Sequence, residues 1–150
     1  MKNVIFKVLF WLLWPLVWVY APLRARARVL IVCDDQFLAV KPYFGRGKWQ
    51  LPGGGIKFGE RAIDAATREL YEEVSLPLHD LQNLIPVQTY TEKGLLLRYV
   101  LFYKKIATRP IITKNKEIAD TKWLPLSHPS GCSGHVRSAV NTFNKLHLLK

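Results

Sequence analysis

Cysteine is scarce in this chain of 150 residues, which contains only Cys33 and Cys132. Cys33 lies in a run typical of a β-strand, and Cys132 lies in a stretch rich in glycine and serine. Two cysteines at this spacing do not form a metal-binding motif. We expect both to be free thiols in a reducing, cytosolic compartment. The chain also contains no internal repeat, which argues against a repeat architecture.

Acidic residues are few compared with basic ones: 11 Asp and Glu against 22 Lys and Arg give a formal net charge of +11. Residues 1–28 contain five Lys or Arg and no acidic residue, so both this segment and the remainder are basic. A positive excess attracts anionic partners over long range. Nucleotides, RNA and membranes with acidic lipids all fit, and the charge does not choose among them.

The acidic residues that matter most follow a glycine-rich stretch. Gly54-Gly55-Ile56-Lys57-Phe58-Gly59-Glu60 is followed, seven residues after Glu60, by Arg68-Glu69-Leu70-Tyr71-Glu72-Glu73. On a helix, Glu69, Glu72 and Glu73 fall within about a third of the circumference, where they can share a divalent cation. The apolar face, Ile63, Ala66, Leu70 and Val74, has the spacing of a helix packed on a sheet. Glutamates crowded at one border of that face favour a site over an ordinary solvated surface.

This pattern resembles the Nudix box. The chain matches the motif at Gly54, Glu60, Arg68, Glu69, Leu70, Glu72, Glu73 and Leu76. The resemblance implies catalytic roles for these charged residues: Glu60 and Arg68 orient the helix as a pair, while Glu69, Glu72 and Glu73 bind metal or help to deprotonate water. Mg²⁺, with Mn²⁺ as a possible substitute, suits such an oxygen-rich site. The family also implies two further metal ligands, the backbone carbonyl of Gly53 and the carboxylate of Glu117, although a surface role for Glu117 is equally open.

Ser75 is the one departure, because the family has glycine there. Helices commonly end on a glycine in the left-handed conformation. A serine in that conformation costs on the order of 1 kcal/mol, unless the helix ends differently. We expect the substitution to affect stability more than chemistry.

The element order predicts an α/β fold, and the resemblance implies a Nudix α/β/α sandwich with a mixed sheet, preceded by an N-terminal hydrophobic helix. Residues 24–150 form the predicted Nudix hydrolase domain, and residues 1–23 form a separate hydrophobic segment. The expected strands are Ala27–Cys33, Phe37–Lys41, Leu84–Tyr90, Leu95–Ile106 and Lys122–Leu126, and a helix is expected over Gly134–Leu149.

The N-terminal segment is unusually apolar. Residues 4–23 are interrupted only by Lys7. A spanning helix needs roughly 20 apolar residues, but Pro15 and Pro22 would kink or end it. A spanning or inserted anchor, an interfacial helix and a helix packed on protein all remain open. The arginines that follow predict a cytoplasmic catalytic domain at the inner face of a membrane, and cleavage as a signal peptide is not expected.

The main prediction is a Mg²⁺-dependent hydrolase that cleaves a diphosphate bond in a nucleoside diphosphate linked to another moiety. Candidate phosphate contacts are Arg46, Lys48 and Arg98. Two alternatives remain: an RNA pyrophosphohydrolase or RNA-binding relative, and a non-catalytic, membrane-held nucleotide sensor. A homodimer is possible because dimers are common in the family.

Overall fold

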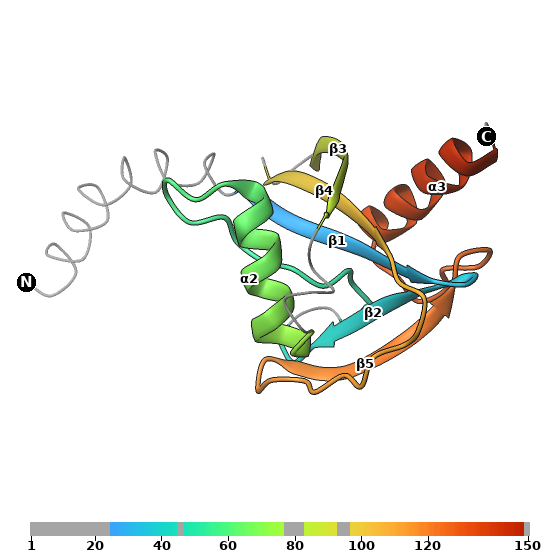
Figure 1. The fold of residues 1–150 in the computed structure, drawn as a ribbon, viewed down its shortest axis with the longest axis horizontal. Helices are drawn as coiled ribbons and strands as arrows, with labels where there is room; N and C mark the ends of the chain where they lie inside the picture. Colours follow the sequence, from blue (N-terminus) through green and yellow to red (C-terminus); the bar gives the residue numbers. More distant parts are fainter. Residues whose placement is uncertain (1–24, 45–46, 77–82, 93–96, 149–150) are drawn as a thin grey trace, which may run out of the picture.

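The computed structural model describes residues 25–44, 47–76, 83–92 and 97–148 (Figure 1). The predicted hydrophobic segment therefore lies outside the described residues. The elements in chain order are β1 (Ala25–Cys33), β2 (Gln36–Pro42), α2 (Ala62–Val74), β3 (Ile85–Glu92), β4 (Leu97–Lys105), β5 (Ile118–Pro125) and α3 (Gly134–Leu148). Every strand and helix expected from the sequence in these ranges is present.

The five strands form one mixed sheet in the order β3-β4-β1-β2-β5. β1 and β4 are parallel, and the other neighbouring pairs are antiparallel. β1 and β2 form the predicted hairpin, with Cys33 opposite Gln36. Asp34 takes a positive φ of 54° in the connecting turn, a conformation that Asp tolerates better than most residues. The register of β1 against β2 is thus set by a short local turn.

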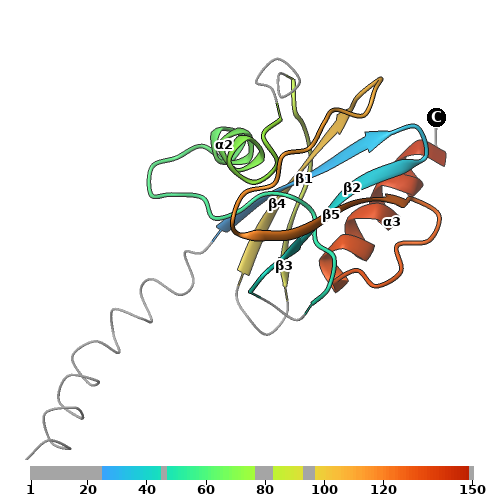
Figure 2. The same ribbon diagram turned by 90° about the horizontal axis from the view of Figure 1, so that it is seen from below.

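A helix covers each face of the sheet (Figures 1 and 2). Strand alternation sends Val29 and Ile31 into a core with α2, and Leu30 and Val32 into a second core with α3. The buried apolar residues of α2 are Ala65, Ala66, Leu70 and Val74, and those of α3 are Val136, Ala139, Val140 and Phe143. The predicted α/β/α sandwich with a mixed sheet is confirmed.

β5 begins earlier than the sequence indicates. The expected strand starts at Lys122, whereas the observed strand starts at Ile118. Its first residues pair with the end of β2, where Lys41 faces Asp120 and Pro42 faces Ile118 across a register shift. These residues lack a clear apolar alternation, so their strand character comes from pairing with β2. The extension brings Glu117 to the edge of the sheet near α2.

The segment before α2 lies along the sheet and positions the site. Gln50 exchanges both backbone hydrogen bonds with Val40, at 2.8 and 2.9 Å. The backbone N–H of Ala27 then donates to the carbonyl of Gly54 at 2.9 Å, and that of Val29 donates to Pro52 at 3.0 Å. The glycine loop is therefore held against β1 by backbone pairing. Among the described helices, α2 and α3, neither has the length and apolar character needed to cross a bilayer.

Candidate active site

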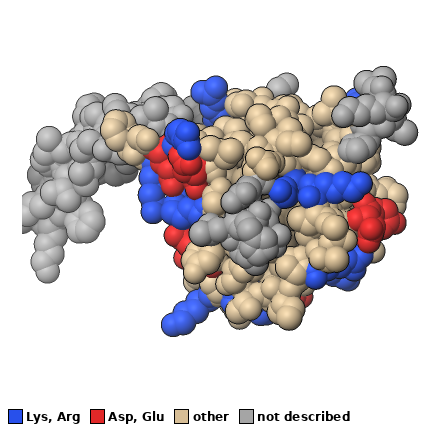
Figure 3. Space-filling view, in the orientation of Figure 1, with Lys and Arg blue, Asp and Glu red and all other residues tan. Residues whose placement is uncertain are grey.

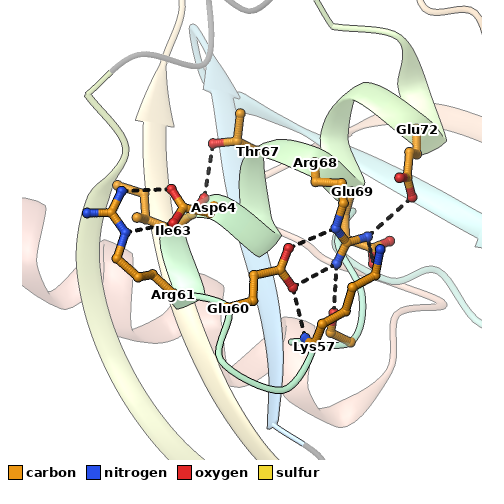
Figure 4. A network of polar contacts seen from close by, with 10 residues as sticks. Lys57, Glu60, Arg61, Ile63, Asp64, Thr67, Arg68, Glu69 and Glu72 are labelled. Atoms are coloured by element: carbon orange, nitrogen blue, oxygen red, sulfur yellow. Dashed lines mark hydrogen bonds and ion pairs between the residues drawn. The ribbon is translucent and has the colours of Figure 1, made fainter.

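The predicted pair of Glu60 and Arg68 joins the end of the glycine loop to α2 (Figure 4). Arg68 donates to both carboxylate oxygens of Glu60, from Nε at 2.9 Å and from Nη2 at 3.1 Å. The backbone N–H of Lys57 also donates to Glu60 at 2.8 Å. The Arg68 hydrogen bonds, then the Lys57 backbone bond, lower the pKa of Glu60 to about 2. Glu60 is therefore ionised at neutral pH, and the predicted pair is confirmed.

Arg68 also reaches three other groups around the same point (Figure 4). It donates to the carboxylate of Glu69 at 2.7 Å, to that of Glu72 at 3.3 Å and to the carbonyl of Gly55 at 3.0 Å. A planar guanidinium with five donors suits such a hub, since a lysine ammonium offers no fixed fork. Arg68 therefore holds the loop, the helix and two candidate ligands, Glu69 and Glu72, together.

Glu73 lies at the inner border of α2 and is partly buried. Its Oε2 accepts a hydrogen bond from the backbone N–H of Gly53 at 2.8 Å. Burial raises the pKa of Glu73 to about 7, with Glu69 and Glu117 adding to the rise, while the Gly53 bond and Arg28 oppose it. Without a cation nearby, this carboxylate is thus held in a place that disfavours its charge.

Two glycines in the loop have steric reasons to be glycine. Gly53 has a φ of +123°, and a Cβ there would lie 2.3 Å from the carbonyl oxygen of Ala27. A Cβ on Gly54 would lie 2.3 Å from the carboxylate of Glu69. The loop therefore approaches β1 on one side and a candidate metal ligand on the other, closer than any side chain allows.

The predicted residues partly converge on a cavity of about 300 Å³. Gly53, Glu69, Glu73 and Glu117 line it. Glu72 is not among the lining residues: its side chain is 51% exposed and turns to Arg68. The structure thus separates the three glutamates of the helix into two that face the cavity and one beside it.

The described candidate phosphate contacts do not lie at the cavity. Lys48 and Arg98 are both exposed and do not line the cavity, and Arg46 lies outside the described residues. Arg26, Arg28 and Gln50 line it instead. The sequence reasoning treated the two arginines only as charges flanking the hydrophobic segment. The available signal was an arginine at an inward position within the apolar alternation of β1.

The candidate ligands at the cavity are the carboxylates of Glu69, Glu73 and Glu117 and the carbonyl of Gly53. They suit a hard divalent cation because each offers oxygen atoms. Among the described residues, no three His, Cys, Asp or Glu side chains are grouped as a ready-made metal site. Mg²⁺ does not require one, since it usually binds through one or two carboxylates together with waters and substrate phosphates. Glu69 and Glu73 supply two such carboxylates, and the close fit of Glu69 over Gly54 fixes where one of them lies.

Ser75 ends α2 in the left-handed conformation, with φ 51° and ψ 36°. Its backbone N–H donates to the carbonyl of Tyr71 at 3.1 Å. The helix thus ends as it would on a glycine, and the serine adopts the conformation whose cost the sequence analysis predicted.

Comparison with known proteins decides the family. A family model described as the NUDIX domain matches residues 22–137, which includes the glycine loop, α2 and the whole sheet. The chain belongs to the Nudix family. The resemblance found in the sequence is therefore confirmed over most of the chain.

Relatives of this Nudix domain include two proteins named RNA pyrophosphohydrolase. One, from Escherichia coli O139:H28, is 37% identical over 105 residues, which cover 68% of this chain and 54% of the relative. The other, from Sodalis glossinidius, is 35% identical over 101 residues, covering 65% and 51%. The chain thus spans about half the length of these relatives.

Solved structures share the fold at low identity. An Ap4A hydrolase from C. elegans, in a binary complex, has a TM-score of 0.70 at 19% identity, covering 85% of this chain and 99% of that one. The dihydroneopterin triphosphate pyrophosphohydrolase of E. coli has a TM-score of 0.68 at 23% identity, covering 79% and 93%. These similarities support the α/β/α sandwich.

Proposed function

We propose that this Nudix domain is a Mg²⁺-dependent hydrolase that cleaves a diphosphate bond in a nucleotide or nucleotide derivative. The observation that carries the proposal is one cavity lined by Glu69, Glu73 and Glu117 as well as by Arg26. A complex of a divalent cation with a polyphosphate needs both kinds of group, carboxylates for the cation and guanidinium groups for phosphate oxygens.

Each residue then has a role that its contacts support. Glu69 and Glu73 would hold the cation, with Glu72 and Glu117 as further candidates. The Gly53 carbonyl, the predicted backbone ligand, accepts a hydrogen bond from Arg28, so it would bind the cation through its second lone pair. A bound divalent cation lowers the pKa of its water and neutralises charge on the phosphates. Arg68 and Glu60 orient the helix, and Arg26 faces the space available to phosphate. Positioning of the substrate and neutralisation of its charge would account for most of the rate enhancement.

The test is phosphate release from nucleoside triphosphates, nucleotide sugars, ADP-ribose and dinucleoside polyphosphates, with Mg²⁺, with Mn²⁺ and with EDTA. We expect metal-dependent turnover in the wild type and its loss, by at least about a hundredfold, in Glu73→Gln. A variant that keeps wild-type turnover would contradict the site assignment. Folded wild-type protein that binds nucleotide without any turnover would favour the sensor alternative.

A second candidate activity, removal of pyrophosphate from the 5′ end of RNA, has its own support. Two relatives carry the name RNA pyrophosphohydrolase, and the chain's net charge is +11. On the face drawn in Figure 3, however, the described Lys and Arg side chains form separate groups with acidic groups among them. Adding triphosphorylated RNA to the substrate panel tests this activity. RNA binding by a basic surface should weaken steeply as the salt concentration rises. Absence of both turnover and RNA binding at low salt would exclude an RNA substrate.

We also propose, from the sequence alone, that residues 4–23 hold the domain at the cytoplasmic face of a membrane. The support is the apolar run followed by Arg24, Arg26 and Arg28. Fractionation of cells that express the full chain and a variant lacking residues 1–23 tests this. Equal recovery of both proteins in the soluble fraction would refute it.

A further inference from the structure

Arg28 is a charged residue in the interior of the sheet. It lies in β1 between Ala27 and Val29, and only 4% of it is exposed. Burying a guanidinium is costly unless its donors are satisfied and an opposite charge is near. Burial lowers the pKa of Arg28, and nearby Glu73 opposes that change. The residue would therefore not be expected at this position for stability alone.

The guanidinium of Arg28 donates its hydrogen bonds to the loop of residues 50–53. Nη1 donates to the carbonyl of Leu51 at 2.8 Å and, in a second short contact, to the carbonyl of Gly53. Nη2 donates to Oε1 of Gln50 at 3.2 Å. Nε is buried without a hydrogen-bond partner in the described structure. Three hydrogen bonds, to Gln50, Leu51 and Gly53, thus hold the loop against β1.

Gly53 connects Arg28 to the candidate metal ligand. Its carbonyl accepts from Arg28, while its backbone N–H donates to Glu73 at 2.8 Å. The φ of +123° and the 2.3 Å approach of an added Cβ to the Ala27 carbonyl oxygen show that only glycine fits here. The carbonyl and the N–H belong to the two peptide planes that meet at the Gly53 Cα, so a displacement of that Cα would disturb both contacts.

We propose that Arg28 is a positioning residue for the metal site: it fixes Gly53 so that Glu73 is presented to a divalent cation in the cavity. This inference rests on the proposed function, because it assigns Arg28 a part in the same site. Lysine cannot replace it, since one ammonium cannot reach Leu51, Gln50 and Gly53 with the geometry of a planar fork. The charge alone is therefore insufficient.

The experiment compares wild type, Arg28→Lys, Arg28→Gly and Arg26→Met in the full-length chain. Mn²⁺ binding is measured by electron paramagnetic resonance without substrate, and kcat and KM are measured on the best substrate of the panel. Circular dichroism melting identifies the temperature range in which each variant is folded. Arg26 is the matched control because it is a cavity-lining arginine two residues away on β1, without a side-chain hydrogen bond to the described loop.

We expect Arg28→Lys to weaken Mn²⁺ binding and lower kcat by about tenfold or more, with KM changed much less. Added methylguanidinium should restore part of the Mn²⁺ binding and part of the kcat of Arg28→Gly. It should change neither quantity in wild type. Arg26→Met should instead raise KM and leave Mn²⁺ binding intact, since Arg26 does not hold Gly53.

Three results would overturn the inference. Wild-type Mn²⁺ binding and kcat in folded Arg28→Lys would show that charge suffices, and a change confined to KM would make Arg28 a substrate contact. A lower melting temperature with unchanged binding and turnover would leave only a structural role. Failure of the proposed function would give a different result. If the wild type binds Mn²⁺ without any turnover and Arg28→Lys loses that binding, the proposed function fails while the positioning role of Arg28 stands.

Discussion

Replacing Glu73 by glutamine is expected to stabilise the metal-free protein while removing its activity. The carboxylate of Glu73 is partly buried, and burial raises its pKa from 4.5 to about 7. Glutamine has nearly the same shape, and its amide oxygen can still accept the Gly53 N–H that Glu73 accepts at 2.8 Å. The substitution therefore removes the charge and keeps the main contact.

The magnitude follows from the pKa. Since the pKa of Glu73 is higher in the folded chain than in the unfolded chain, the folded state binds this proton more tightly. The resulting stabilisation is fully present below about pH 4.5 and is lost as the pH rises through about 7. The loss amounts to at most roughly 3 kcal/mol by pH 8, at about 1.4 kcal/mol per pKa unit. Glu73→Gln lacks this loss, so its advantage over wild type should grow with pH.

The assay is urea unfolding of wild type and Glu73→Gln in EDTA at pH 5 and pH 8. The difference between the free energies of unfolding of the two proteins cancels the titration of groups present in both. Such groups include Glu60 and His135, whose pKa values are lowered to about 2 and about 4. We expect similar stabilities at pH 5 and a variant more stable by about 1–3 kcal/mol at pH 8.

A control and a refuting result sharpen this test. Glu72→Gln changes the same residue type on the same helix, but Glu72 is 51% exposed, so its effect should stay within about 0.5 kcal/mol at both pH values. Equal effects of Glu73→Gln at both pH values, or a variant less stable than wild type at pH 8, would refute the assignment of a destabilised carboxylate. Saturating Mg²⁺ should raise the melting temperature of wild type and not that of Glu73→Gln.

Three further substitutions test other parts of the site. Ser75→Gly should raise the free energy of unfolding by about 1 kcal/mol, because Ser75 has a φ of 51°; no gain in urea unfolding would contradict the strain. Gly54→Ala should reduce both Mn²⁺ affinity and kcat by roughly tenfold or more, because the added Cβ would displace the Glu69 carboxylate. Mn²⁺ titration measures the affinity and steady-state kinetics measure kcat. Wild-type values of both would count against Glu69 as a ligand. Arg68→Lys should cost roughly 2 kcal/mol in chemical denaturation, since a lysine loses the double hydrogen bond to Glu60; an unchanged midpoint would show that charge alone holds the loop.

Much of the fold and part of the site could be predicted from the sequence because both depend on short spacings. Apolar periodicity located the hairpin, α2 and α3. The resemblance to the Nudix box predicted that Glu60 and Arg68 pair, which the structure shows at 2.9 Å. The start of β5 at Ile118 was missed, because that part of the strand depends on its partner β2 rather than on its own residues.

The sequence by itself determined which residue types carry the chemistry: a cluster of glutamates on one helix, a glycine loop and an orienting arginine. Only the tertiary structure decided which of them share a cavity. It placed Glu69 and Glu73 there and Glu72 outside, and Arg26 and Arg28 line the cavity whereas Lys48 and Arg98 do not. The physical reason is that the glycine loop pairs with β1 through backbone hydrogen bonds. Backbone pairing leaves little trace in side-chain pattern, yet it brings Arg28 to Gly53 across 25 residues.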